Sequence, residues 1–238
     1  VYMWFSLEDI RQFTQEQSDM VWVNDGKINV ENVFGRSLSL VTRFRDEHIS
    51  DNLITWTPAW NEALREDRHI FTACATWSVK FSIESSDPQQ KNLGRWGLMS
   101  APEGNANLGG TSMGITKTCK DKRLAWEFLK FATLSTEGAR TLNSMGLMTT
   151  AKKPYEEEPS LKSYKSRWFG NQDLGIYYMD HIIPSIKTRT LTSQDGVIHE
   201  CLWMILNALN RDGNLSSEEA EELLREELQK DLKDITVY

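Results

Sequence analysis

Short apolar runs and helical repeats alternate along the first part of the chain. Residues 21–23 and 28–30 are apolar and flank Asn24-Asp25-Gly26-Lys27. Asp-Gly readily adopts the positive φ angles of a hairpin turn, so this stretch predicts strand, turn and strand. Apolar residues then recur at helical spacing over 34–44. Pro58 predicts the start of a helix to about Arg68, since proline suits a first helical turn.

Three further apolar runs predict buried or half-buried strands, because each is short and bounded by turn residues. They cover residues 70–75, 96–99 and 111–116. Between the first two, residues 84–94 are polar and contain Asp87-Pro88, which predicts a solvated loop.

The second half is dominated by helical periodicity. After Asp121, one apolar stripe comprises Leu124, Ala125, Phe128, Leu129 and Ala132. Ser135 starts a further predicted helix that Gly146 ends. Apolar helices are predicted at 174–183 and 197–209, with Trp203 in the core. The chain is therefore predicted to be α/β, with a short mixed sheet flanked by helices and a helix-rich second half.

Two capping signals mark the last helices. Thr192 and Asp195 have the spacing of a capping box, and so do Ser216 and Glu219, with Leu215 placed as a hydrophobic staple. The final helix is amphipathic, with leucines on one face and mostly Glu and Lys on the other. That charged face is predicted to be solvated.

Composition excludes several classes of function. The 238 residues have a net charge of −7, with 39% hydrophobic and 26% charged residues, which is typical of a globular protein. The acidic balance argues against nucleic acid as a partner. No apolar run approaches the roughly 20 residues of a membrane span. The three cysteines (Cys74, Cys119, Cys201) and four histidines are scattered, so no disulfide framework, metal site or cofactor is predicted.

The chain opens with Val1-Tyr2-Met3-Trp4-Phe5, within an apolar run and without a signal-like segment. This start is typical of a piece of a longer protein. The unpaired cysteines are expected to be buried or distant from one another, because Cys74 and Cys201 lie on apolar elements.

Three blocks, in order, resemble the extracellular solute-binding proteins of ABC importers, in the maltose-binding-protein-like group. Residues 60–77 are similar to the helix, turn, strand and ligand-facing tryptophan of that family, although Ala75-Thr76 replaces the usual glycine before Trp77. Residues 96–104 and 108–115 resemble its strand, Pro, Gly and Gly-Gly signature. Residues 119–131, followed by 135–138, are the third block of the resemblance.

The resemblance implies the C-terminal lobe of a type II periplasmic-binding-protein fold. Residues 1–238 would form one α/β lobe of a two-lobed protein, with closing helices at about 193–235 and without the N-terminal lobe. Such proteins clamp a solute between two lobes. The implied protein is extracytoplasmic, monomeric and not an enzyme. It would pass a carbohydrate to ABC permease subunits and associate with the membrane through an N-terminal anchor or through the permease. The isolated lobe is expected to bind its ligand weakly.

Candidate ligand-binding residues follow from the same resemblance: Trp77, Gly109, Gly110, Tyr2, Trp4, Gln194 and Asp195. An aromatic ring offers a flat apolar face to sugar C–H groups, and glycine lets the backbone approach a ligand. Each residue also has a purely structural explanation. Trp77 would then be a core residue, the glycines a turn, Tyr2 and Trp4 part of a strand, and Gln194 and Asp195 helix caps.

Two alternatives remain open. Gly110-Thr111-Ser112-Met113-Gly114 matches the nucleophile elbow of α/β-hydrolases, which requires a strand before the serine and a helix directly after it. Asp180, His181 and His199 lie downstream. The other alternative is an interaction domain that partners a membrane sensor.

Overall fold

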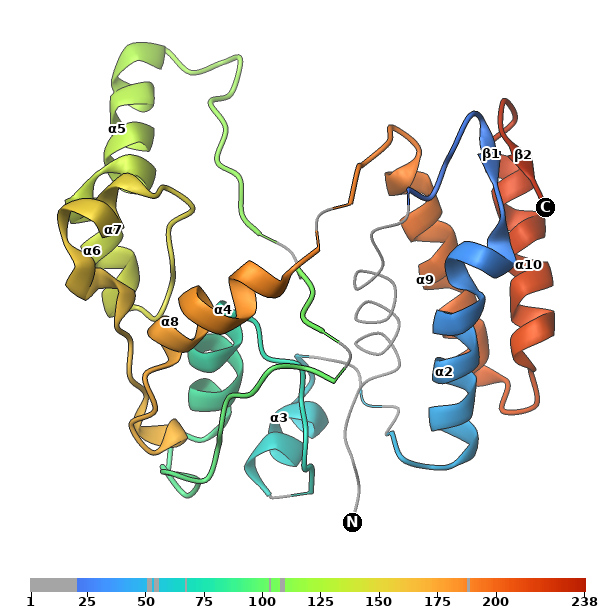
Figure 1. The fold of residues 1–238 in the computed structure, drawn as a ribbon, viewed down its shortest axis with the longest axis horizontal. Coiled ribbons are helices and arrows are strands. Elements are labelled where there is room, and N and C mark those ends of the chain that lie inside the picture. The colour runs from blue at the N-terminus through green and yellow to red at the C-terminus, as the bar shows by residue number, and fades with distance from the viewer. Residues whose placement is uncertain are drawn as a thin grey trace. The chain divides into compact units, whose positions relative to one another are not determined.

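The computed structural model describes residues 21–50, 53, 56–66, 68–102, 104–107, 110–187 and 189–238. These residues form two compact units (Figure 1). Unit 1 comprises the described residues up to Ala73, Pro102–Asn107 and Ile186–Tyr238, and unit 2 comprises Cys74–Ala101 and the described part of Leu108–Ser185. The prediction that the chain is one lobe stays a prediction.

Unit 1 contains helices and one pair of short strands. Its elements are β1 (Lys27–Ile28), the π-helical turn η1 (Glu31–Gly35), α2 (Arg36–Asp46), α3 (Pro58–Arg65), α9 (Asp195–Arg211), α10 (Ser217–Asp231) and β2 (Thr236–Val237). The helices predicted at 34–44, from Pro58, at 197–209 and at the C-terminal end are therefore confirmed.

The predicted turn forms, but the predicted hairpin does not. Asp25 and Gly26 have φ angles of 48° and 70°, and Asn24 and Lys27 exchange two backbone hydrogen bonds. Val30 is already helical, so too little extended chain follows the turn for a hairpin partner. β1 instead pairs in parallel with β2, with Lys27 opposite Thr236 and Ile28 opposite Val237.

The core of unit 1 joins η1, α2, α9 and α10. Its fully buried side chains include Phe34, Leu38, Ile198, Leu202, Leu209, Leu224 and Leu228. Cys201 is buried in the same cluster, as expected. The prediction for Trp203 is wrong, because its side chain is 50% exposed. Its neighbour Leu202 takes the inward position on the helix.

Side chains satisfy some of the helix termini of unit 1. Ser216 Oγ accepts from the backbone N–H of Glu219, and the Glu219 carboxylate accepts from the backbone N–H of Ser216, which confirms the capping box. The guanidinium of Arg45 on α2 donates to the carbonyls of Leu209 (3.2 Å), Asp212 (3.1 Å) and Leu215 (2.8 Å). One α2 side chain thus caps the C-terminal end of α9 and holds the loop that leads to α10.

Unit 2 is built from short helices. They are α4 (Thr76–Ser78), η2 (Val79–Glu84), α5 (Lys122–Leu134), α6 (Thr136–Ser144), α7 (Lys153–Glu157), η3 (Pro159–Lys162), η4 (Arg167–Phe169), α8 (Leu174–Tyr177), η5 (Tyr178–Ile182) and η6 (Ile183–Ser185). Buried side chains of this unit are Val79, Ile83, Leu98, Ala139, Leu161, Phe169, Leu174, Tyr178 and Ile182. The predicted helix restart at Ser135 and its end near Gly146 are confirmed.

The three strands predicted at 70–75, 96–99 and 111–116 are wrong: these residues are irregular. Ile70 is 50% exposed, and residues 111–114 are also exposed. The segment 96–99 is held without a strand ladder. Leu98 exchanges hydrogen bonds with the Gln172 side-chain amide, at 2.8 and 2.9 Å. A strand requires a backbone partner, which a local apolar pattern does not reveal.

The predicted loop at 84–94 is largely confirmed, and residues 88–91 at its centre are exposed, but the loop is not solvated throughout. Helical structure continues to Ser86, and Asp87 and Asn92 are buried. The Asp87 carboxylate accepts from the backbone N–H groups of Lys91 (2.9 Å) and Asn92 (2.8 Å) and from Trp168 Nε1 (3.0 Å). Burial alone would raise the pKa of Asp87, but these donors hold it below its ordinary value.

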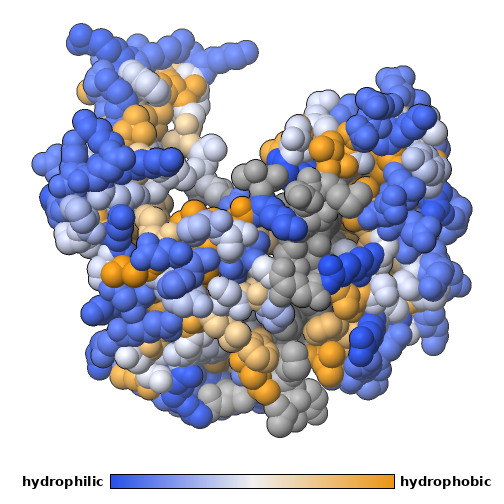
Figure 2. Space-filling view, in the orientation of Figure 1, coloured by the Kyte–Doolittle hydropathy of each residue, from blue (hydrophilic) through white to orange (hydrophobic). Residues whose placement is uncertain are grey.

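Helix α5 forms where it was predicted, with Asp121 as its N-cap. Its apolar stripe is not covered, however, and none of its residues is buried. Leu124, Phe128 and Phe131 are more than half exposed, and Figure 2 shows apolar surface on this part of unit 2.

Candidate functional site

Trp77 lies in α4, at the point where an extended segment turns into a helix. Ala75 is extended, and its carbonyl accepts from the backbone N–H of Ser78 at 2.9 Å. The carbonyl of Cys74 accepts from the hydroxyl of Tyr178 at 2.7 Å. Trp77 itself is half-buried, so the residue is not sealed in the interior as a core tryptophan would be.

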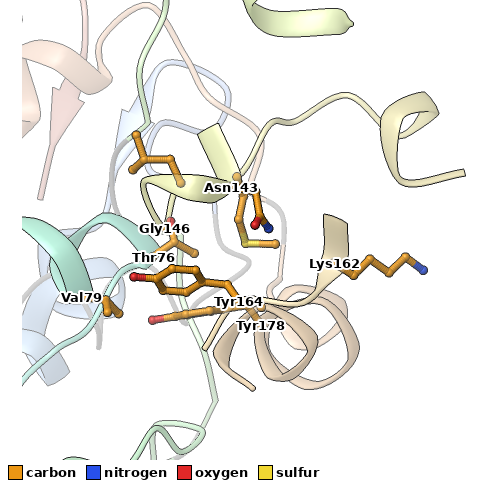
Figure 3. Close-up of a pocket in the computed structure, with 10 residues that line it drawn as sticks. Thr76, Val79, Asn143, Gly146, Lys162, Tyr164 and Tyr178 are labelled. Atoms are coloured by element: carbon orange, nitrogen blue, oxygen red, sulfur yellow. The ribbon is translucent and has the colours of Figure 1, made fainter. Parts of the chain in front are cut away.

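A small pocket in unit 2 lies beside α4. It is lined by residues that come together from η2, α6, η3, α8 and η5 as well as α4 (Figure 3): Thr76, Val79, Asn143, Gly146, Leu147, Met148, Lys162, Tyr164, Gly175 and Tyr178. Its free space holds about one water molecule. A sugar does not fit, so this pocket supports α4 and is not itself a solute site.

Polar groups from distant segments tie this pocket together. Asn143 Nδ2 donates to the carbonyls of Leu161 (2.7 Å) and Ser163 (3.1 Å). The backbone N–H of Leu174 donates to the Tyr164 carbonyl at 2.7 Å. Burial raises the pKa of the Tyr164 hydroxyl to about 12, and the nearby Glu84 carboxylate adds to the effect.

Two glycines allow the close packing around this pocket. Gly146 has a φ of 72°, and a Cβ there would lie 2.7 Å from the Tyr164 ring. At Gly175 a Cβ would lie 2.1 Å from the Lys162 carbonyl oxygen. Larger residues at either position would push these segments apart.

Burial raises the pKa of the Cys74 thiol to about 11, so at neutral pH the group is a protonated thiol and a poor nucleophile. Cys74 and Cys119 are half-buried rather than fully buried, and all three cysteines are free. In the described part of the chain, no group of three His, Cys, Asp or Glu side chains is arranged to hold a metal ion.

Gly110 is exposed and has a φ of 140°, a conformation that strongly favours glycine. A Cβ there would meet nothing within 4 Å, so the surface beside it is open. The neighbouring candidate, Gly109, lies outside the described residues, as do Tyr2 and Trp4.

Gln194 and Asp195 lie in unit 1, at the start of α9. The Asp195 carboxylate accepts from the backbone N–H (3.1 Å) and the hydroxyl of Thr192, and it forms an ion pair with Arg189. The Arg189 guanidinium in turn stacks on Trp22, 3.7 Å from the ring centroid. Gln194 makes no side-chain cap bond. The Asp195 carboxylate is therefore already bound by Thr192 and Arg189.

The candidate residues do not all belong to one unit. Trp77 and Gly110 lie in unit 2, whereas Gln194 and Asp195 lie in unit 1. Sequence analysis missed Tyr178 and Tyr164. No local signal could have found them, because Tyr178 is 104 positions from the carbonyl that it holds.

The surroundings of Ser112 do not match a nucleophile elbow. Residues 110–116 are irregular and mostly exposed, and the next helix begins only at Lys122. An elbow requires a helix directly after the serine. The described residues also contain no helix of sufficient length and apolar character to cross a bilayer.

Solved structures of solute-binding proteins are similar to the chain. A family 1 extracellular solute-binding protein matches with a TM-score of 0.78 and 18% identity, over 97% of this chain and 59% of that one. The sugar-binding protein MalE of Xanthomonas citri matches with a TM-score of 0.68 and 16% identity, over 98% of this chain and 58% of that one. The third structure is the galacto-N-biose/lacto-N-biose I-binding protein of a Bifidobacterium longum ABC transporter, in complex with lacto-N-biose. It matches with a TM-score of 0.69 and 16% identity, over 100% of this chain and 60% of that one.

These likenesses confirm the predicted fold class, that of the type II periplasmic-binding proteins. The chain spans about three-fifths of the length of each of these structures. No curated protein sequence matches it significantly. Residues 2–167 match the family described as bacterial extracellular solute-binding proteins. That match covers more than half of the chain, which therefore belongs to this family of extracytoplasmic proteins that bind solutes.

Proposed function

We propose that the chain is part of a solute-binding protein that captures a carbohydrate and delivers it to the permease of an ABC importer. The family match is the observation that carries this proposal. Two of the similar structures are sugar-binding proteins, and one of them serves an ABC transporter. The protein acts as a monomer that docks on the permease, without cofactor or catalysis.

Trp77 is proposed as the aromatic platform for the sugar. Support comes from the half-buried position of the residue and from the hydrogen bonds that fix the segments on both sides of it. A rigid indole face packs against the C–H groups of a sugar ring at little entropic cost, since few rotatable bonds are frozen. Gly110, with its open surroundings, is proposed to bring backbone N–H groups toward the hydroxyls. The proposed ligand set also includes Gly109, Tyr2, Trp4, Gln194 and Asp195.

The test is calorimetric titration with a panel of oligosaccharides that includes lacto-N-biose. The protein is produced from its reading frame at the full length of the similar structures. Trp77→Ala is expected to weaken binding of the best sugar by about 2 kcal/mol, roughly 30-fold, as for a buried aromatic anchor. The control is Trp203→Ala, which removes an exposed tryptophan of α9 and should leave affinity unchanged. Equal affinity in both variants would remove Trp77 from the site, and no sugar binding at all would contradict the carbohydrate assignment.

A further inference from the structure

Helix α5 carries an apolar stripe that no described residue of unit 2 covers. Leu124, Phe128 and Phe131 follow one another at i, i+4 and i+7 and are 67%, 58% and 51% exposed. Leu134, also 51% exposed, extends the stripe by one turn. Spacings of three and four residues place these side chains on one face. Globular proteins rarely leave so continuous an apolar surface open unless it binds something.

The helix is well anchored by its other positions, so the stripe is not the result of a frayed end. Asp121 Oδ1 accepts from the backbone N–H of Leu124 at 2.8 Å. At the other end, Thr149 Oγ1 donates to the Thr133 carbonyl at 2.6 Å. The first turn of α6 packs so closely on α5 that a Cβ on Gly138 would lie 2.3 Å from the Phe131 carbonyl oxygen.

Charged residues border the stripe, and a further apolar side chain of α5, Trp126, is 52% exposed. Glu127 and Lys130 form an ion pair at 2.8 Å, with side chains that are 58% and 41% exposed. The half-buried Ala125, Leu129 and Ala132 occupy the side between the stripe and Thr133. The sequence thus provides α5 with more apolar surface than α6 can cover.

We infer that this face packs against the portion of a full-length solute-binding protein that the chain does not represent. The similar structures match 97–100% of this chain with only 58–60% of their own length. About two-fifths of such a protein is therefore available to cover α5. The occupant is a polypeptide of the same folded body, with an apolar surface of its own. The inference depends on the family and the fold rather than on the nature of the solute, so it holds or fails separately from the proposed function.

Hydroxyl-radical footprinting tests the inference, because it reports the solvent exposure of individual aromatic side chains. The 238-residue chain is compared with the protein produced from its reading frame at the full length of the similar structures. Phe128 and Phe131 are expected to oxidise readily in the chain and to lose most of that oxidation in the full-length protein. Equal oxidation in both would overturn the inference, and so would a reading frame that encodes no further folded segment.

A variant pair provides a second readout. Phe128→Glu is expected to leave the melting temperature of the 238-residue chain nearly unchanged, because the ring is already exposed there. In the full-length protein it should lower the melting temperature by about 5 °C or more, because a carboxylate would be buried. The control Arg123→Glu changes an exposed position of the same helix and should affect neither form. Protection that develops in the 238-residue chain at high concentration, together with a dimer by light scattering, would instead assign the face to a second copy.

Discussion

The hydroxyl of Tyr178 donates a hydrogen bond to the carbonyl oxygen of Cys74 across 2.7 Å, and so holds the segment that leads into Trp77. Tyr178 is buried. Burial raises the pKa of its hydroxyl, so the group remains a donor throughout the physiological range. The backbone that leads to a proposed ligand-binding ring is therefore anchored by a residue from a distant part of the chain.

Tyr178→Phe is expected to destabilise unit 2 by about 1–2 kcal/mol, because the partly buried Cys74 carbonyl loses its donor. Amide hydrogen exchange at residues 75–79 should become faster. Tyr155→Phe is the matched control, since Tyr155 donates to the Thr149 carbonyl at 3.1 Å elsewhere in the same unit. Faster exchange at 75–79 in the Tyr155 variant as well would show a general loosening of the unit rather than the loss of one anchor.

Arg45→Ala is expected to lower the free energy of unfolding of unit 1 by about 2–3 kcal/mol. The change removes charge-assisted bonds to three carbonyls at the end of α9 and in the loop that follows it. Arg43→Ala is the control on the same helix. Arg43 pairs with Glu47 in the open, with side chains 69% and 48% exposed, and such pairs contribute about 0–1 kcal/mol. Denaturant unfolding of both variants measures the difference, and similar losses would contradict the assigned role of Arg45.

Ser216→Ala removes half of the capping box of α10 and is expected to cost about 1 kcal/mol. Hydrogen exchange should accelerate first at the N-terminal turn of that helix. Ser217→Ala, one residue inside the helix, should be neutral or slightly stabilising because alanine is the better helix former. A greater loss of stability in the Ser217 variant would show that the cap contributes little.

The pH dependence of stability is expected to be steep on the alkaline side. In the folded protein the pKa of Cys74 is raised from 9.0 to about 11 and that of Tyr164 from 10.0 to about 12, in both cases chiefly by burial. The folded state therefore holds these protons more tightly than the unfolded state does. Their contribution to stability is complete below about pH 9 and is lost as the pH rises toward 12.

Thermal unfolding between pH 7 and 11 measures this effect. Tyr164→Phe should flatten the upper part of the profile, whereas Tyr238→Phe, which changes an exposed side chain, should not. A profile that Tyr164→Phe leaves unaltered would show that this hydroxyl does not contribute to the alkaline loss.

Local signals predicted those features that depend on neighbouring residues. The box formed by Ser216 and Glu219, the turn at Asp25-Gly26 and the start of α5 at Asp121 all lie within four positions of the groups that they satisfy. Such short-range hydrogen bonds depend little on the rest of the fold.

Features that depend on distant partners were not predictable from the sequence. The apolar run at 96–99 has the composition of a strand, yet Gln172, 74 positions from Leu98, takes the place of a strand partner. Arg45 meets α9 across 164 positions. For α5 the pattern correctly predicted an apolar face, but a periodicity does not specify which surface will cover it.

The most direct test of the central claim is titration calorimetry of two forms of the protein against the same oligosaccharide panel. The 238-residue chain alone is expected to bind every sugar weakly or not at all, because the proposed site is incomplete. The protein at the full length of the similar structures should bind at least one of them with a dissociation constant of about 1 μM or below. Micromolar sugar binding by the 238-residue chain on its own would contradict the account, as would a full-length protein that binds none of the sugars.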